Sequence, residues 1–167
     1  HASLTAIAAV VAQRGRGTVY LSDQTHACIL RALRVLGFDD SQIRVLASDA
    51  QYRLPPAGLE AAIAADRDAG LTPLMIVATA GTTNTGAIDP LDAIADICKD
   101  EQLWLHVDGA YGAPTALTAN GRERLTGMDR ADSLVLDPHK WLFQPYDTGC
   151  LLIRPGLLEP CFAMDAE

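Results

Sequence analysis

An unbroken apolar run, LMIVAT, occupies Leu74–Thr79. A short apolar run bounded by turn-forming residues is typical of a strand that is buried on both faces. A second run of this kind, LWLHV, follows at Leu103–Val107, after a helical stretch at Pro90–Asp100. Strands that alternate with helices predict a mostly parallel sheet with helices on both faces, which is an α/β fold.

The same alternation extends outward from these two strands. The other predicted helices are Ser3–Gln13, His26–Leu36 and Pro56–Ala69, and the other predicted strands are Thr18–Ser22, Ile43–Leu46, Ser133–Leu136 and Cys150–Ile153. The last two strands lie close together with no clear helix between them, so one of them is expected to run antiparallel. The 167 residues suffice for one domain with a substantial core and are too few for most two-domain enzymes.

Composition narrows the class of protein. The net charge of −8 argues against a nucleic-acid surface, which needs a basic stripe. No run of about 18 apolar residues is present, so the sequence predicts no membrane span. The 49% apolar content suits an ordinary α/β enzyme, which we expect to be cytoplasmic.

The four cysteines offer three interpretations: a disulfide framework, a zinc site or separate core thiols. Cys28, Cys98, Cys150 and Cys161 are widely spaced and form no CxxC pair. Wide spacing in a sequence of cytosolic composition favours separate thiols, so no metal site is predicted.

Polar and ionisable residues follow four of the predicted strands. They are Ser22, Asp23 and His26; Thr79, Gly81, Thr82 and Thr83; Asp108; and Asp137, His139 and Lys140. In open α/β sheets, ligands bind at the carboxyl ends of the strands. Four such ends therefore predict one binding site.

Asp108 and Lys140 indicate the chemistry of that site. A lysine after a strand end can form a Schiff base, and a buried carboxylate can hold a protonated heterocycle; pyridoxal phosphate (PLP) needs both groups. Small residues after Asp108, namely Gly109, Ala110 and Gly112, would let a flat ring approach the backbone. Asp108 could instead be a turn former, and Lys140 a surface lysine.

The neighbouring residues also allow two readings. The apolar residues Trp141–Phe143 suggest that Lys140 is partly buried. His26 could simply begin a helix, or its imidazole could stack on a pyridine ring. Thr82 and Thr83 could be loop hydroxyls or cofactor contacts. His106 shares a sheet face with Asp108 and is expected to be a structural residue and not a catalyst.

Four motifs in this order resemble the group II PLP-dependent decarboxylases, in the branch of the aromatic-L-amino-acid decarboxylases. They are SDQTH at 22–26, AGTTNTG at 80–86, HVDGAY at 106–111 and DPHKW at 137–141. The resemblance covers nearly the whole chain. It implies the large-domain fold of fold-type I PLP enzymes, which is aspartate aminotransferase-like.

The resemblance also implies a role for each site residue. Lys140 would carry the cofactor as a Schiff base, and Asp108 would bind the pyridine nitrogen. His26 and Ala110 would cover the two ring faces, and Thr83 would contact the cofactor. His139 would lie beside the lysine, near the reacting centre. Asp137 stands where many members carry Asn near the phosphate, so it adds a negative charge there.

The resemblance further implies decarboxylation of an L-amino acid, in this branch an aromatic one. An aldehyde synthase or aminotransferase-like reaction, or an inert fragment, remains an alternative. The chain begins with His1, and we expect it to be part of a longer polypeptide. Residues 1–167 would form part of a PLP-binding large domain, without the upstream phosphate-binding turn, the closing loop and the C-terminal small domain. The family forms homodimers with the active site at the interface.

Overall fold

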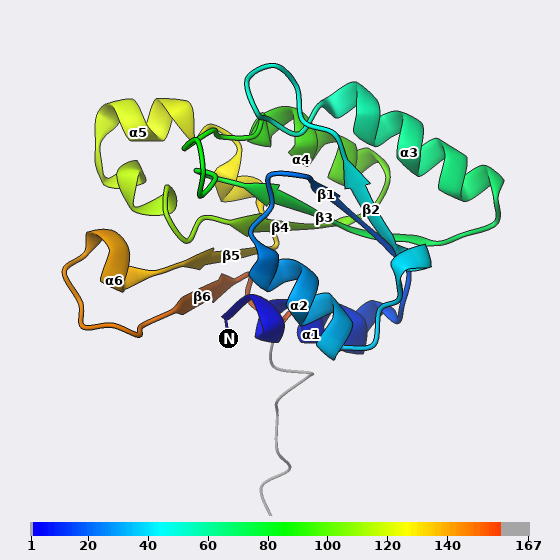
Figure 1. Ribbon diagram of the computed structural model, residues 1–167, viewed down its shortest axis with the longest axis horizontal. Coiled ribbons are helices and arrows are strands. Elements are labelled where there is room, and N and C mark those ends of the chain that lie inside the picture. The colour runs from blue at the N-terminus through cyan, green and yellow to red at the C-terminus, as the bar shows by residue number, and fades with distance from the viewer. Residues whose placement is uncertain (1, 158–167) are drawn as a thin grey trace, which may run out of the picture.

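The computed structural model describes residues 2–157 and shows a six-stranded sheet. The strands are β1 (Thr18–Ser22), β2 (Ile43–Leu46), β3 (Pro73–Thr79), β4 (Trp104–Asp108), β5 (Ser133–Leu136) and β6 (Cys150–Ile153). Their order is β2-β1-β3-β4-β5-β6 (Figure 1). All pairs are parallel except β5 with β6. The predicted α/β class and the antiparallel pair are confirmed.

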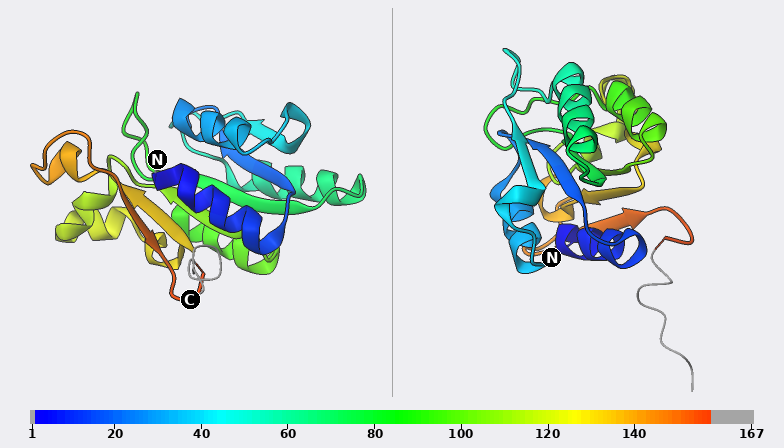
Figure 2. Two further views of the ribbon diagram at one scale, coloured as in Figure 1. Left: turned by 90° about the horizontal axis from the view of Figure 1, so that it is seen from below. Right: turned by 90° about the vertical axis from the view of Figure 1, so that its right-hand side faces the viewer.

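Helices cover both faces of this sheet, as the two views of Figure 2 show. The helices are α1 (Ala2–Arg14), α2 (Ala27–Val35), α3 (Pro56–Asp68), α4 (Leu91–Asp100), α5 (Ala119–Arg124) and α6 (Pro138–Trp141). Single 3-10 turns lie at Asp40–Gln42, Ala113–Leu117 and Met128–Arg130. In this described part of the chain, no helix is long and apolar enough to cross a bilayer.

The alternating side chains of the central strands build two separate cores. Met75 and Val77 of β3 pack with residues of α1 and α2, whereas Ile76 and Ala78 pack with residues of α3 and α4. Successive residues of a strand point to opposite faces, so a strand buried on both faces must be apolar throughout. This requirement explains the run LMIVAT that first indicated the fold.

The element boundaries differ from the prediction in a few places. The second helix begins at Ala27, and His26 is its N-cap. Strand β4 extends to Asp108. Two short helices, α5 and α6, were not predicted, because segments of four to six residues are too short to show a helical period. Three cysteines, Cys28, Cys98 and Cys150, are free thiols, whereas Cys161 lies outside the described residues.

The carboxyl ends of β3 and β4 are joined by backbone hydrogen bonds that continue past the strands. Ala80 N donates to Asp108 O at 2.8 Å, and Gly112 N donates to Ala80 O at 2.9 Å. A Cβ atom at Gly112 would overlap the carbonyl of Ala80, so only glycine fits there. Gly81 has φ = +93°, a left-handed conformation that glycine adopts without strain.

Candidate active site

One cavity of about 840 Å³ opens at the carboxyl ends of β3, β4 and β5. Its volume is in the range of small-molecule sites. The residues predicted from the sequence to have a catalytic or cofactor-binding role line it: His26, Thr83, Asp108, Ala110, Asp137, His139 and Lys140. Ser22, Asp23 and Thr82, which were also expected at these strand ends, do not line it. The structure therefore brings together residues separated by up to 114 positions (140 − 26) in the sequence. Their roles remain predictions.

Asp108 lies at the base of this cavity, at the end of β4. Its side chain is buried, and the residue is 5% exposed. Oδ1 accepts a hydrogen bond of 3.1 Å from Ala110 N. Burial raises the pKa of Asp108, although that hydrogen bond and the positive charges of Lys140 and His26 oppose the rise. A buried carboxylate of this kind is stabilised by a cation placed beside it.

Lys140 enters the cavity from α6, which follows β5. Its Nζ lies 2.9 Å from Asp137 Oδ2, and its side chain is 36% exposed. The side chain is thus partly covered, but the apolar neighbours that were expected to cover it are themselves open to solvent, because Trp141 is 46% and Phe143 is 98% exposed. Helix α6 is a single turn near the end of the sheet (Figure 1), and Trp141 is not among the residues of either core.

His139 links α6 to the segment that leads into β6. Its Nδ1 lies 2.8 Å from Thr148 O and 3.2 Å from Thr148 N. The ring of Tyr146 packs edge-on against the imidazole, with 5.0 Å between the ring centroids. His139 is thus held beside Lys140 by contacts across the loop.

His26 approaches the cavity from the opposite side, at the start of α2. Its Nδ1 accepts a hydrogen bond of 3.4 Å from Cys28 N, which caps the helix. The helix-start interpretation is therefore correct, and the exposed imidazole also faces the cavity. Both functions can be served by one ring, since the cap uses only Nδ1.

His106 is a buried structural residue on the same sheet face as Asp108. Its Nδ1 lies 2.8 Å from Ser133 Oγ, which also accepts a hydrogen bond of 2.8 Å from Trp104 Nε1. Complete burial lowers the pKa of His106 to about 4, so the ring is neutral at pH 7.

Asp89 is a residue that the sequence interpretation missed. It is 3% exposed, and its carboxylate accepts 2.7 Å hydrogen bonds from Leu54 N and Thr79 N. Burial raises the pKa of Asp89 to about 6, against the effect of those two bonds. The sequence gives no signal for these contacts, because an Asp before Pro90 is also a typical helix-start residue.

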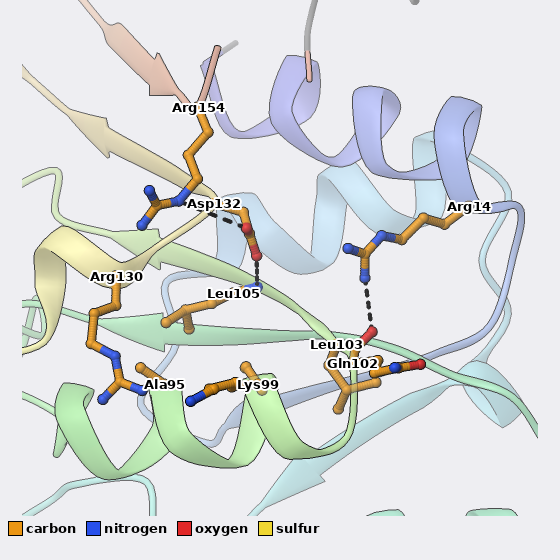
Figure 3. Close-up of a pocket in the computed structure, with 10 residues that line it drawn as sticks. Arg14, Ala95, Lys99, Gln102, Leu103, Leu105, Arg130, Asp132 and Arg154 are labelled. Atoms are coloured by element: carbon orange, nitrogen blue, oxygen red, sulfur yellow. Dashed lines mark hydrogen bonds and ion pairs between the residues drawn. The ribbon is translucent and has the colours of Figure 1, made fainter. Parts of the chain in front are cut away.

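A second cavity, of about 410 Å³, lies at the opposite end of the sheet (Figure 3). Arg130 lies there within 2.7 Å of Asp92 and Asp96, and Arg14 Nη1 donates to Gln102 O at 2.9 Å. Lys99, the only lysine besides Lys140, lines this cavity. It therefore cannot replace Lys140 at the carboxyl ends of the strands.

The donor set of the first cavity fits PLP. A buried carboxylate suits a protonated ring nitrogen, and an accessible lysine amine suits the cofactor carbonyl. Thr79 Oγ1, which also lines the cavity, is buried and has no hydrogen-bond partner, as expected where a polar ligand completes the site. Within residues 2–157, no group of three metal-ligating side chains occurs.

This sheet, with an acid and a lysine beyond adjacent strand ends, has the fold of the large domain of fold-type I PLP enzymes. Residues 8–167 match the model of the pyridoxal-dependent decarboxylase conserved domain. The chain belongs to this family, and the prediction of PLP as its cofactor is confirmed.

Individual relatives agree with this assignment. An aromatic-L-amino-acid decarboxylase of Bacillus atrophaeus is 54% identical over 81% of the chain, and a phenylacetaldehyde synthase of a Rosa hybrid cultivar is 35% identical over 92%. The crystal structure of Oryza sativa TDC with PLP and tryptamine superposes on 99% of the chain with a TM-score of 0.92 and 36% identity. The chain spans 28%, 31% and 37% of the lengths of these three proteins, respectively.

Proposed function

We propose that this chain is part of a PLP-dependent carboxy-lyase that converts an aromatic L-amino acid to its amine and carbon dioxide. The observation that carries the proposal is the meeting of buried Asp108 and accessible Lys140 in one cavity. The 54% identity to an aromatic-L-amino-acid decarboxylase supports both the reaction and the substrate class.

Lys140 would attach and release the cofactor, and Asp137 would position the amine of that lysine. Attachment at a carbonyl carbon requires an unprotonated amine at Nζ. Asp137 Oδ2 lies 2.9 Å from Nζ, so it would position the amine in the cavity. This position also explains how Asp is tolerated where many family members carry Asn, since here it pairs with the lysine.

Asp108 would bind the ring nitrogen and keep a proton on it. Bound PLP supplies a ring that accepts the electron pair of the breaking bond between Cα and the carboxylate. The negative charge of Asp108, held in a buried site, favours the protonated ring electrostatically. His26 and Ala110 would cover the two ring faces, and Thr83 would add a polar contact at the end of β3.

We also propose that the chain forms part of a PLP-binding large domain whose remaining parts complete the site. The first turn of α1 lines the cavity through Ala2 and Ser3, where a phosphate-binding turn just before α1 would place its N–H groups. The exposed aromatic side chains of Trp141, Phe143 and Tyr146 suit a homodimer interface. Three free thiols favour a cytoplasmic location.

An aldehyde-forming reaction is the second candidate, because a phenylacetaldehyde synthase is 35% identical to this chain. Lys140 and Asp108 would serve that reaction equally well. The two reactions differ in their products, so product analysis distinguishes them.

The test uses the complete reading frame that contains this chain. The purified protein should bind PLP so that borohydride fixes it to Lys140, and it should release carbon dioxide and amine from tryptophan or tyrosine. Aldehyde in place of amine would support the second candidate. PLP that cannot be fixed by borohydride would contradict both. Residues 1–167 alone should bind PLP weakly and give no turnover; robust turnover would contradict the proposed partial domain.

A further inference from the structure

A buried hydroxyl in the active-site cavity has no hydrogen-bond partner. In the described part of the chain, Thr79 Oγ1 and His106 Nε2 are the two buried side-chain polar atoms without a partner. Only Thr79 of these two residues lines the cavity. Buried polar groups are nearly always hydrogen-bonded, so this hydroxyl requires an explanation. A polar ligand atom would supply one.

Thr79 stands directly beside Asp108. It is the last residue of β3, is 4% exposed and pairs in register with Asp108 of β4. Side chains of residues paired in this way project from the same face of the sheet. Met75 and Val77, on the same face of β3, pack with α1 and α2, so Thr79 faces the same layer as the cavity.

The backbone of Thr79 is fixed on both sides. Its N–H donates to Asp89 Oδ2 at 2.7 Å, and its carbonyl accepts from Asp89 N at 3.0 Å. The next N–H, of Ala80, donates to Asp108 O at 2.8 Å. The hydroxyl is thus held on a rigid strand end, which is how preorganised binding groups are built.

The arrangement of the cavity identifies which edge of PLP would meet Thr79. The ring nitrogen and the carbonyl carbon lie at opposite ends of the pyridine ring, and Asp108 and Lys140 are proposed to bind them. The phosphate arm and the phenolic oxygen lie on the two sides of that axis. Ala2, Ser3 and Gly149 line the side near β6, where a phosphate would meet the first turn of α1. Strand β3 lies on the other side of β4, so the phenolic edge would face the end of β3, where both Thr79 and Thr83 line the cavity. Thr83 is exposed, whereas the hydroxyl of Thr79 is the buried one that has no partner.

We propose that Thr79 is a further cofactor-binding residue, whose hydroxyl donates a hydrogen bond to the phenolic oxygen of PLP. The inference rests on the proposed function, because it takes Asp108 and Lys140 as the ends of the ring axis. A donor at this position stabilises the ionised form of the phenol. It also gives the bound ring one orientation, since the phosphate and phenolic edges then meet different partners.

The central experiment replaces Thr79 by Val in the complete reading frame, which removes the hydroxyl and keeps the shape of the side chain. The dissociation constant of PLP, measured by absorbance titration, should rise about ten- to a hundredfold, as for a lost hydrogen bond to a charged group. The melting temperature of the PLP-free protein should stay the same or rise, because an unpartnered buried hydroxyl is gone. A merely structural Thr79 predicts a lower melting temperature, which would overturn the proposal.

Two further variants serve as controls. Thr79→Ser keeps a hydroxyl and should bind PLP nearly as the wild type does. Thr18→Val removes another buried threonine hydroxyl, which lies 2.8 Å from Tyr20 Oη at the far end of β1. This variant should lower the melting temperature and leave PLP binding unchanged.

The analogue 3-deoxypyridoxal 5′-phosphate, which lacks the phenolic oxygen, identifies the contact. Wild type and Thr79→Val should bind it equally, because the partner atom is missing from the ligand. An equal loss of affinity for PLP and for the analogue would overturn the assignment to the phenolic oxygen. Normal PLP binding by Thr79→Val would overturn this inference alone, whereas a wild type that takes up no PLP would overturn the proposed function as well.

Discussion

The two sides of the active-site cavity are built differently. The floor, which we define as Thr79–Gly81 and Asp108–Gly112, is formed by two paired strand ends, with Thr79 4% and Asp108 5% exposed. The rim, defined as Pro138–Gly149, is a single helical turn followed by a loop. Its large side chains are open to solvent, with Tyr146 85% and Phe143 98% exposed.

This difference shows which half of the site the chain forms by itself. The floor is held by backbone hydrogen bonds such as Ala80 N to Asp108 O and Gly112 N to Ala80 O. The rim carries Lys140. The aromatic side chains of the rim, however, are largely exposed to solvent in the described part of the chain. We therefore expect substitutions in the floor to act locally on a preformed site, whereas the rim depends on the proposed partner subunit.

The largest expected effect lies in the rim. Lys140→Ala in the complete reading frame should abolish both turnover and borohydride-stable attachment of PLP, because no other lysine reaches the cavity. Mass spectrometry after borohydride treatment measures the attachment. Lys99→Ala is the matched control, since Lys99 lines the cavity at the other end of the sheet. Label found on Lys99 in the Lys140 variant would refute the assignment.

A smaller but still severe effect is expected in the floor. Asp108→Asn should lower kcat by roughly 10²–10³, as for the loss of a preorganised electrostatic contact. The melting temperature of the PLP-free protein should change little, because an amide oxygen can still accept from Ala110 N and the buried charge is removed. Steady-state kinetics and thermal unfolding measure the two effects. Turnover near that of the wild type would reduce Asp108 to a turn-forming residue.

The smallest effect concerns the support of the floor. Asp89→Asn should lower the free energy of unfolding by about 1–3 kcal/mol at pH 4, because the amide nitrogen cannot accept from Leu54 N or Thr79 N. The folded-state pKa of Asp89, about 6, lies above the ordinary value of 3.8. The folded state therefore favours protonated Asp89, and this contribution to stability is lost as the pH rises from about 4 to 6.

Denaturant unfolding of wild type and Asp89→Asn across this pH range measures the effect. The advantage of the wild type should shrink as the pH rises, and an advantage that grows instead would contradict the raised pKa.

The sequence predicted the sheet because its strands are short apolar runs separated by clear breaks. It also predicted the site residues as a group, since the carboxyl ends of parallel strands meet at one edge of the sheet. Asp89 could not be predicted in this way, because its bonds reach a backbone N–H 35 residues away, at Leu54. The exposure of Trp141 and Phe143 was also missed, because apolar neighbours in sequence do not reveal what packs over them.

The strand order has a kinetic consequence. Each of the four parallel pairs joins segments that a long connection separates along the chain, so the sheet is rich in non-local contacts. Folds of this kind form slowly, because closing each loop costs chain entropy before the stabilising contacts between the two strands can form. The ends of β3, β4 and β5 must all be in place before PLP can bind, so PLP would bind the folded sheet and not the unfolded chain. By mass action, PLP at a hundred times its dissociation constant would stabilise that sheet by about 2.7 kcal/mol.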